Sequence, residues 1–322
     1  MRALLALASP TAARRVHSVA MKAYTADDAA ARACEHALSL YQRSRLRASF
    51  PRRAGTRPRA ADEVGRGAYS RAATDELMRR SEISELAGPA TILELGAGSG
   101  RFSEQLAASV AAAGPRECKL LAVEPAGSVE RLARRAASFK LPTTVVRAAA
   151  EALPLGDQSV DAVVVAQAFH WFPEAAVGEI DRVLRRGGPL ALYWNIRSAT
   201  TADGAFVSAL SQLEELITDT YHPGTPRQQS GEWRAPLLES GLFGHHLQRA
   251  DVPATWGGPL ADCVDGVMSV SGIATRSERD RKEIKAEVRR LLRAAAAELG
   301  QDPNGELCFP CVEELWWTRS VP

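Results

Sequence analysis

Short apolar segments alternate with amphipathic stretches between residues 90 and 195, and this order constrains the fold more than any other feature of the sequence. The apolar segments are continuous, which is typical of strands that are buried on both faces. Strands joined by helices form a parallel sheet with right-handed crossovers. We therefore predict an α/β, doubly wound sheet with strands at 90–95, 119–123, 143–147, 160–166 and 189–195, and helices at 101–113, 127–138 and 173–186.

The segments beyond residue 195 are expected to complete this sheet and to cover it. Residues 245–252 and 312–318 alternate like partly exposed strands and would close the sheet. Residues 203–219 and 278–299 are helical in pattern, and in such a fold they would form a cap over a ligand pocket. In doubly wound sheets the ligand binds at the carboxyl ends of the strands, near the point where the strand order reverses.

The composition excludes several classes of protein. With 322 residues the chain can bury one large core or two modest ones. It contains no run of about 18 apolar residues, so no membrane partner is expected. The formal net charge of +2 supplies no strong field for nucleic acid. We expect residues 1–60 to form an N-terminal extension and residues 61–320 to form the folded domain.

The N-terminal extension has two parts of different composition. Residues 1–26 carry basic residues, Ala, Leu, Ser and Thr but no acid, which is typical of a mitochondrial or plastid transit peptide. An ordinary terminal helix, or a start at Met21, would explain the same composition in a cytoplasmic protein. Residues 42–59 are rich in Arg and have no acid, and they lack the interleaved aromatic residues that nucleic-acid stacking requires. We interpret them as a basic linker.

The five cysteines are odd in number and scattered, which favours a reducing, intracellular compartment. Cys308 and Cys311 are spaced like a metal-binding or redox pair. No second pair or suitably spaced histidine accompanies them in the sequence, and a strand rather than a helix is predicted after them. We therefore expect no metal site.

The strongest chemical signal is the segment L-E-L-G-A-G-S-G-R-F at residues 93–102. A predicted strand ends at Glu94 and Leu95, and the glycines at alternate positions, Gly96, Gly98 and Gly100, allow a sharp turn and a close approach to a ligand. The dinucleotide-binding pattern G-x-G-x-x-G would place its third glycine at Arg101. Instead, G-x-G-x-G preceded by an acid is the pattern that binds S-adenosylmethionine. At the end of the next strand, the Glu124 carboxylate could accept both hydroxyls of a ribose.

A wider set of motifs resembles class I S-adenosylmethionine-dependent methyltransferases that act on small molecules, in particular the branch of trans-aconitate methyltransferases. The motifs are A-E-A-L-P, Q-A-F-H-W-F, R-V-L-R-R-G-G and Y-W-N, all within residues 148–195. The resemblance extends over about residues 62–319 and implies a Rossmann-like sheet of seven strands. It departs from the family at Ser70 and Arg186, where the family usually has proline.

The resemblance also implies roles for individual residues. The acid and the glycines of the loop would hold the methionine and ribose parts of the cofactor, Glu124 would bind the ribose hydroxyls, two residues after the third strand would border the adenine, and one residue after the fourth strand would face cofactor and acceptor. In that order these residues are Glu94, Gly96, Gly98, Gly100, Glu124, Ala150, Glu151 and Gln167.

The acceptor side has three candidates. His170 could orient or deprotonate the nucleophile and Trp171 could form a wall of the pocket, or both could pack beneath the cofactor loop. Tyr69 could reach the ligand or belong to the core. His245 and His246 look like surface strand residues, and the Trp316–Trp317 pair is expected to pack the last strand.

These observations predict methyl transfer to a small-molecule acceptor, on oxygen or nitrogen, with a carboxylate as one acceptor that needs no base. Methyl transfer from a sulfonium requires mainly that donor and acceptor are held in line, so neither a metal nor a catalytic triad is required. Two alternatives remain open: methylation of RNA or protein, and a scaffold that binds the cofactor without catalysis. The sequence does not indicate an oligomeric state.

Overall fold

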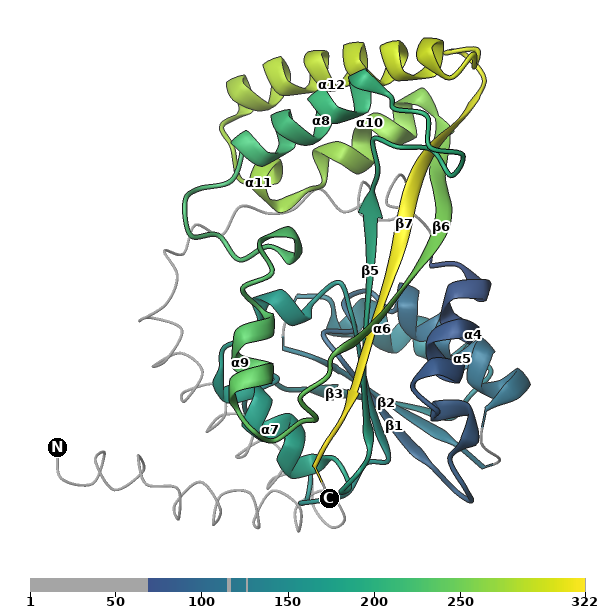
Figure 1. Cartoon of the computed structure of the whole chain (residues 1–322), viewed down its shortest axis with the longest axis vertical. Helices are drawn as coiled ribbons and strands as arrows, with labels where there is room; N and C mark the ends of the chain where they lie inside the picture. The colour runs from purple at the N-terminus through teal and green to yellow at the C-terminus, as the bar shows by residue number, and fades with distance from the viewer. Residues whose placement is uncertain (1–68, 115–116, 126, 322) are drawn as a thin grey trace, which may run out of the picture.

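The computed structural model describes residues 69–114, 117–125 and 127–321, so the predicted extension 1–60 lies outside the described residues. Seven strands form one sheet in the order β3-β2-β1-β4-β5-β7-β6 (Figure 1). The strands are β1 (Thr91–Leu95), β2 (Lys119–Glu124), β3 (Thr143–Arg147), β4 (Ala162–Ala166), β5 (Pro189–Arg197), β6 (Gln248–Pro259) and β7 (Glu306–Arg319).

One described helix precedes the first strand, and the other described helices lie between strands along the chain. They are α4 (Arg71–Arg80), α5 (Arg101–Ala113), α6 (Val129–Ala136), α7 (Ala175–Val183), α8 (Ser208–Asp219), α9 (Arg234–Glu239), α10 (Leu260–Met268), α11 (Ser271–Ala274) and α12 (Glu278–Glu298). Three short 3-10 turns are η2 (Ile83–Glu85), η3 (Phe169–Trp171) and η4 (Gln228–Ser230).

The topology confirms the predicted fold class. Strands β1 to β5 pair in parallel, whereas β7 pairs antiparallel with both β5 and β6. The chain winds outward through β2 and β3 in one direction and through β4 and β5 in the other. The strand order therefore reverses between β1 and β4, which is where a ligand is expected.

The first five strands are confirmed with small shifts at their ends, but the two closing strands were predicted wrongly in length. β6 and β7 run far beyond the predicted segments 245–252 and 312–318. His245 and His246 are exposed and precede β6, so the prediction that they are strand residues is wrong. The helix predicted at 203–219 begins only at Ser208, because residues 200–206 form a bridged loop.

Apolar side chains cover both faces of the sheet. On one face, α4 and α5 pack on β1, β4 and β5 around a core that includes Leu77, Phe102 and Tyr193. On the other face, α7 and α9 pack around a core that includes Ile180 and Trp194. The continuous burial of the central strands follows from these two layers, as the sequence pattern predicts.

A third core forms the cap. α8, α10, α11 and α12 lie together at the far ends of β6 and β7, above the carboxyl edge of the parallel strands (Figure 1). The predicted amphipathic pattern of α12 is confirmed, since Val288, Leu291 and Leu292 are buried in this core. The cap is therefore connected to the sheet through β6 and β7, which contribute residues to both. None of the helices that the structure describes is both long enough and apolar enough to cross a membrane.

Candidate functional site

The three glycines of the loop after β1 have different surroundings. All have positive φ, which L-residues with side chains rarely adopt. A Cβ on Gly96 would lie 2.6 Å from the Cβ of Ala168, and one on Gly100 would lie 2.8 Å from Leu132 Cδ1. A Cβ on Gly98 would meet only the Gly96 carbonyl oxygen, at 4.0 Å. Gly96 and Gly100 thus allow the loop to pack, whereas Gly98 faces open space.

The acid at the end of β1 is buried inside this loop. Glu94 is 1% exposed, and its Oε2 has no hydrogen-bond partner among the residues that the structure describes. Burial raises the pKa of the Glu94 carboxyl to about 7, the Ser103 side chain opposes this shift, and the negative charge of Glu124 adds to it. A buried carboxylate without a partner is costly, so a cationic ligand group beside it would stabilise its charged form.

Glu124, at the end of β2, supports the loop directly. Its Oε2 accepts a hydrogen bond of 3.0 Å from the backbone N–H of Gly98. Adjacent parallel strands bring their carboxyl ends to one edge of the sheet, which is why two acids distant in sequence meet here. Glu124 therefore contacts the glycine loop, and its predicted role in binding the ribose is not tested by this contact.

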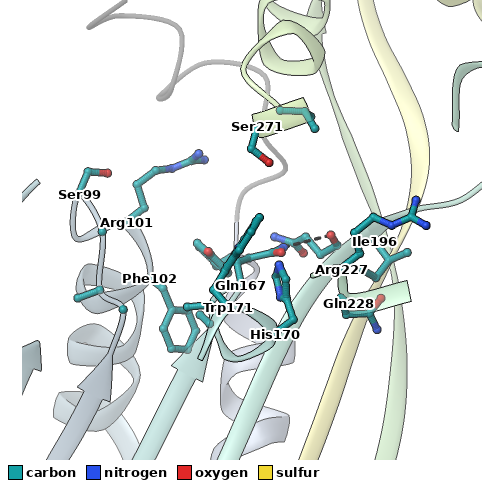
Figure 2. Close-up of a pocket in the computed structure, with 18 of the residues that line it drawn as sticks. Ser99, Arg101, Phe102, Gln167, His170, Trp171, Ile196, Arg227, Gln228 and Ser271 are labelled. Atoms are coloured by element: carbon teal, nitrogen blue, oxygen red, sulfur yellow. Dashed lines mark hydrogen bonds between the residues drawn. The ribbon is translucent and has the colours of Figure 1, made fainter. Parts of the chain in front are cut away.

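A cavity of about 430 Å³ opens at the carboxyl ends of β1, β4 and β5, below the cap. Figure 2 shows Ser99, Arg101 and Phe102 on one side, Arg227 and Gln228 on the other, and Ser271 of the cap above. The predicted residues that line it are Tyr69, Glu94, Gly96, Gly98, Gln167, His170 and Trp171.

Four predicted cofactor residues do not line this cavity. Gly100 packs on Leu132 of α6, and Glu124 lies against the loop rather than in the opening. Ala150 is buried and Glu151 is exposed in a tight turn after β3, where the N–H of Ala152 donates to the Ala149 carbonyl. The roles of these residues at the ribose and adenine stay predictions.

Gln167, directly after β4, is held in a strained conformation. Its φ is +57°, although it is not a glycine. Its N–H donates to the Tyr193 carbonyl at 2.8 Å, and its side-chain Nε2 donates to the Asn195 carbonyl at 3.1 Å. These bonds hold Gln167 at the switch point of the sheet, and such strain is concentrated at functional sites.

His170 and Trp171 lie on the η3 turn that follows. His170 is partly buried, and its Nδ1 accepts a hydrogen bond from the indole N–H of Trp194 at 3.2 Å. Burial lowers the pKa of His170 to about 4, so the imidazole is neutral. Trp171 is 41% exposed, and its ring centroid lies 5.1 Å from that of His170. Both side chains thus reach the cavity while His170 is tied to the core.

Tyr69 packs in the core and also borders the cavity, and its contact with a ligand stays a prediction. Its ring packs edge-on against Phe102 and Tyr193 with centroid distances of 4.9 and 5.2 Å, and it also lines the cavity. The next residue, Ser70, donates from its N–H and hydroxyl to the buried Glu313 carboxylate at 2.8 and 2.5 Å. Proline, which the family usually has at this position, has no N–H and could not make the first of these two bonds. Ser70 makes both bonds to Glu313.

The cap side of the cavity is lined by residues that sequence reasoning missed. Arg197 pairs with Glu214 of α8 at 2.6 Å and lies over the Trp256 ring. Arg227 lies 5.5 Å from the centroid of the Tyr221 ring, and its guanidinium has no acidic partner within the described part of the chain. These residues come from separate segments after residue 195, so no spacing in the sequence brings them together.

The segment that carries Arg227 is tethered to β7. The side-chain amide of Gln228 donates to the Glu314 carboxylate, which also accepts from Arg249 at 2.9 Å and from the indole N–H of Trp316 at 3.2 Å. The Gln228 carbonyl accepts from the indole N–H of Trp233 at 3.1 Å. The position of the segment is therefore set by buried polar contacts to the sheet.

The cysteines in the described part of the chain form no disulfide. Cys308 and Cys311 are both free, and because they lie three positions apart on β7 they face opposite sides, one exposed and one buried. Across residues 69–114, 117–125 and 127–321, no group of three or more His, Cys, Asp or Glu residues is placed to hold a metal ion. The predicted packing of Trp316 and Trp317 is confirmed, since both are buried.

Comparison with known proteins finds methyltransferases that are similar to this chain. Residues 93–192 match the family described as a methyltransferase domain. An uncharacterized methyltransferase-like protein of Schizosaccharomyces pombe is 40% identical over 184 residues, which are 56% of this chain and 64% of that protein. The malonyl-[acyl-carrier protein] O-methyltransferase of Methylococcus capsulatus is 42% identical over 143 residues, 40% of this chain and 50% of that protein.

The chain spans about half the length of the curated relatives that it matches. A solved structure from Anaeromyxobacter dehalogenans, provisionally described as a type II methyltransferase, has the same fold with a TM-score of 0.50 and 22% identity, covering 80% of this chain and 97% of that one. Taken with the strand order and the glycine loop, these matches place a methyltransferase domain at residues 93–192, within a fold of the class I type.

Proposed function

We propose that this chain transfers the methyl group of S-adenosylmethionine to a carboxylate oxygen of a small-molecule acceptor. The observation that carries the proposal is one continuous cavity, in which the glycine loop after β1 and the cap-side arginines line opposite parts. A donor held at the loop and an acceptor held below the cap would meet at Gln167 and His170. Holding two reactants in line is the main requirement of this chemistry.

The residues at the loop fit the proposed cofactor. The Oε2 atom of the buried Glu94 carboxylate lacks a partner and would be stabilised by the ammonium of the methionine part. Gly98 leaves open space where a side chain would obstruct the ligand. When bound, S-adenosylmethionine supplies a methyl group that is activated by attachment to a sulfonium sulfur.

The charges around the cavity favour an anionic acceptor. Four arginines line it against two glutamates, and burial leaves one of these, Glu94, only partly ionised at neutral pH. The arginines are Arg101, Arg131, Arg197 and Arg227. The Methylococcus relative is named a malonyl-[acyl-carrier protein] O-methyltransferase, and this name supports methylation on oxygen. The enclosing cap argues for a small molecule and against RNA or a protein surface.

The reaction moves no proton. The new C–O bond takes its electron pair from the carboxylate, and the C–S bond leaves its pair on sulfur, so the products are a methyl ester and a neutral thioether. The positive charge of the sulfonium and the negative charge of the carboxylate both disappear in the reaction. A site that excludes water avoids stabilising these charges in the reactants. The chain's own contribution is to bind, align and exclude water.

The test is transfer of radiolabelled methyl groups to a fractionated metabolite extract, with RNA and protein fractions as controls. We expect label in small anionic metabolites, released as volatile methanol by mild alkali because methyl esters hydrolyse. Alkali-stable label would indicate N-methylation instead. Label confined to RNA or protein would overturn the proposal, and cofactor binding without any labelling would leave the chain a scaffold.

A further inference from the structure

The hydrogen bond between Trp194 and His170 determines where the imidazole carries its proton. Trp194 is fully buried in β5, and an indole N–H can only donate. Since Nδ1 of His170 accepts this bond at 3.2 Å, Nδ1 carries no hydrogen. A neutral imidazole has one N–H, so the proton lies on Nε2.

The hydrogen bond from Trp194 disfavours the two other protonation states of His170, the Nδ1–H tautomer and the imidazolium form. A hydrogen on Nδ1 would point at the indole N–H and leave a buried donor without a partner. The energetic penalty of an unpaired buried donor favours the Nε2–H tautomer by roughly one to two orders of magnitude. The imidazolium form also needs a hydrogen on Nδ1, so it is disfavoured for the same reason. Burial, which lowers the pKa of His170 to about 4, acts in the same direction.

The other edge of the ring is available to a ligand. His170 lines the cavity, and its Nε2 has no hydrogen-bond partner among the residues that the structure describes. Figure 2 shows His170 between Ser99 and Arg101 of the cofactor side and Arg227 and Gln228 of the cap side. A donor at this place faces the region where methyl donor and acceptor would meet.

We propose that His170 is a fixed hydrogen-bond donor to the acceptor, held in one tautomer by Trp194, and that it does not remove a proton. This inference rests on the proposed function. It restricts the acceptor to nucleophiles that arrive ionised, such as carboxylates, because Nε2 already carries a hydrogen and offers no lone pair. The bond from Nε2–H to one carboxylate oxygen would orient the other oxygen toward the methyl group. Trp194 is then a positioning residue.

Nitrogen NMR of the full-length protein labelled with 15N-histidine reads the tautomer without any assay of activity. We expect, at pH 7, a proton-bearing Nε2 and a lone-pair-bearing Nδ1 for His170, assigned by loss of its signals in His170→Gln. The variant Trp194→Phe, if folded, should give a mixture of both tautomers. A hydrogen on Nδ1 in the wild-type protein would overturn the inference whether or not methyl transfer is found.

Two substitutions at His170 separate a donor from a base. Glutamine places an amide N–H near the position of Nε2, whereas phenylalanine keeps a ring without a donor. We expect His170→Gln to stay within about tenfold of wild-type kcat/KM, and His170→Phe to raise the acceptor KM more than tenfold. Cofactor affinity should be unchanged in both. Equal losses in both variants, confined to kcat, would point to a base and contradict the proposal.

Discussion

At the scale of single residues, the loop after β1 shows that identical residues in one motif can have different tasks. Gly96 and Gly100 are needed because Ala168 and Leu132 lie where side chains would stand. Gly98 has no such neighbour, so apart from its positive φ only a ligand gives a reason for its lack of a side chain. The sequence predicted all three as ligand-binding, since spacing alone does not reveal what surrounds each Cα.

Replacing Gly98 should therefore affect binding more than folding. We expect Gly98→Leu to destabilise the fold by about 1–2 kcal/mol, the cost of a side chain in the left-handed region, and to weaken binding of S-adenosylmethionine at least tenfold. Gly88→Leu is the matched control, since Gly88 also has a positive φ with no atom within 4 Å and lies outside the cavity. Equal cofactor affinity in the two variants, measured by calorimetry, would show that Gly98 does not face the ligand.

Glu94 should make stability depend on pH. Its pKa of about 7 lies above the ordinary 4.5, so the folded state holds the proton more tightly than the unfolded state. The stabilisation is complete below pH 4.5 and is lost as the pH rises through 7. The 1.36 kcal/mol associated with each pKa unit puts the loss at about 3 kcal/mol.

Urea unfolding at pH 5 and pH 8 checks this dependence. We expect Glu94→Gln, which resembles the protonated acid, to match the wild-type protein at pH 5 and to exceed its stability at pH 8. The same change in the free energy of unfolding between the two pH values in both proteins would exclude Glu94 as the titrating group.

At the scale of elements, the sequence predicted the five parallel strands because each is a continuous apolar segment. It failed for β6 and β7, where proline interrupts the pattern. Pro253 is tolerated because β6 is an edge strand, and Pro310 because β5 ends opposite Cys311, so β7 has only one neighbouring strand there. Local signals do not show which neighbours a strand will have.

The candidate site divides in the same way. The half around the glycine loop lies at the ends of neighbouring strands, so motifs could predict Glu94, Gly98 and Gln167 as cavity residues, whereas the role of Glu124 at the ribose stays a prediction. The acceptor half depends on contacts between distant segments, such as the bond from Gln228 to Glu314 across 86 positions. Such a contact leaves no periodicity in the sequence.

The hydrogen bond from Gln228 to Glu314 should control acceptor binding. We expect Gln228→Ala to release the segment that carries Arg227 and to raise the acceptor KM several-fold, with cofactor affinity unchanged. The control Arg249→Ala removes another partner of the same carboxylate but leaves the tether in place. Steady-state kinetics should separate the two variants, and an equal rise of KM in both would mean that the tether does not position Arg227.

At the scale of the whole molecule, the cap and the sheet share their strands. β6 and β7 run from the sheet into the cap core, and the two cores meet along this ribbon (Figure 1). Cavity residues come from both parts, from Glu94 in the sheet to Ser271 in the cap. We therefore expect the described domain to unfold as one unit. The sheet side and the cap side of the cavity then keep their relative positions.

Truncating a buried side chain in the cap core would leave a packing defect, which should lower the stability of the entire described domain. Leu292 is fully buried there, so we expect Leu292→Ala to cost about 2–5 kcal/mol in a single urea transition. Leu238→Ala, at a position 38% exposed on α9, should cost much less. Two separate transitions in the Leu292 variant, seen by fluorescence and circular dichroism, would mean that the cap unfolds alone.

The central claim is that the cavity at the carboxyl edge of β1, β4 and β5 binds S-adenosylmethionine. Isothermal titration of the full-length protein tests it most directly, with NADH as a control ligand and Gly98→Leu as a control protein. The account predicts saturable binding of one S-adenosylmethionine per chain, no binding of NADH, and at least tenfold weaker binding to the variant. No heat of binding to the folded wild-type protein, or undiminished affinity in the folded variant, would contradict it.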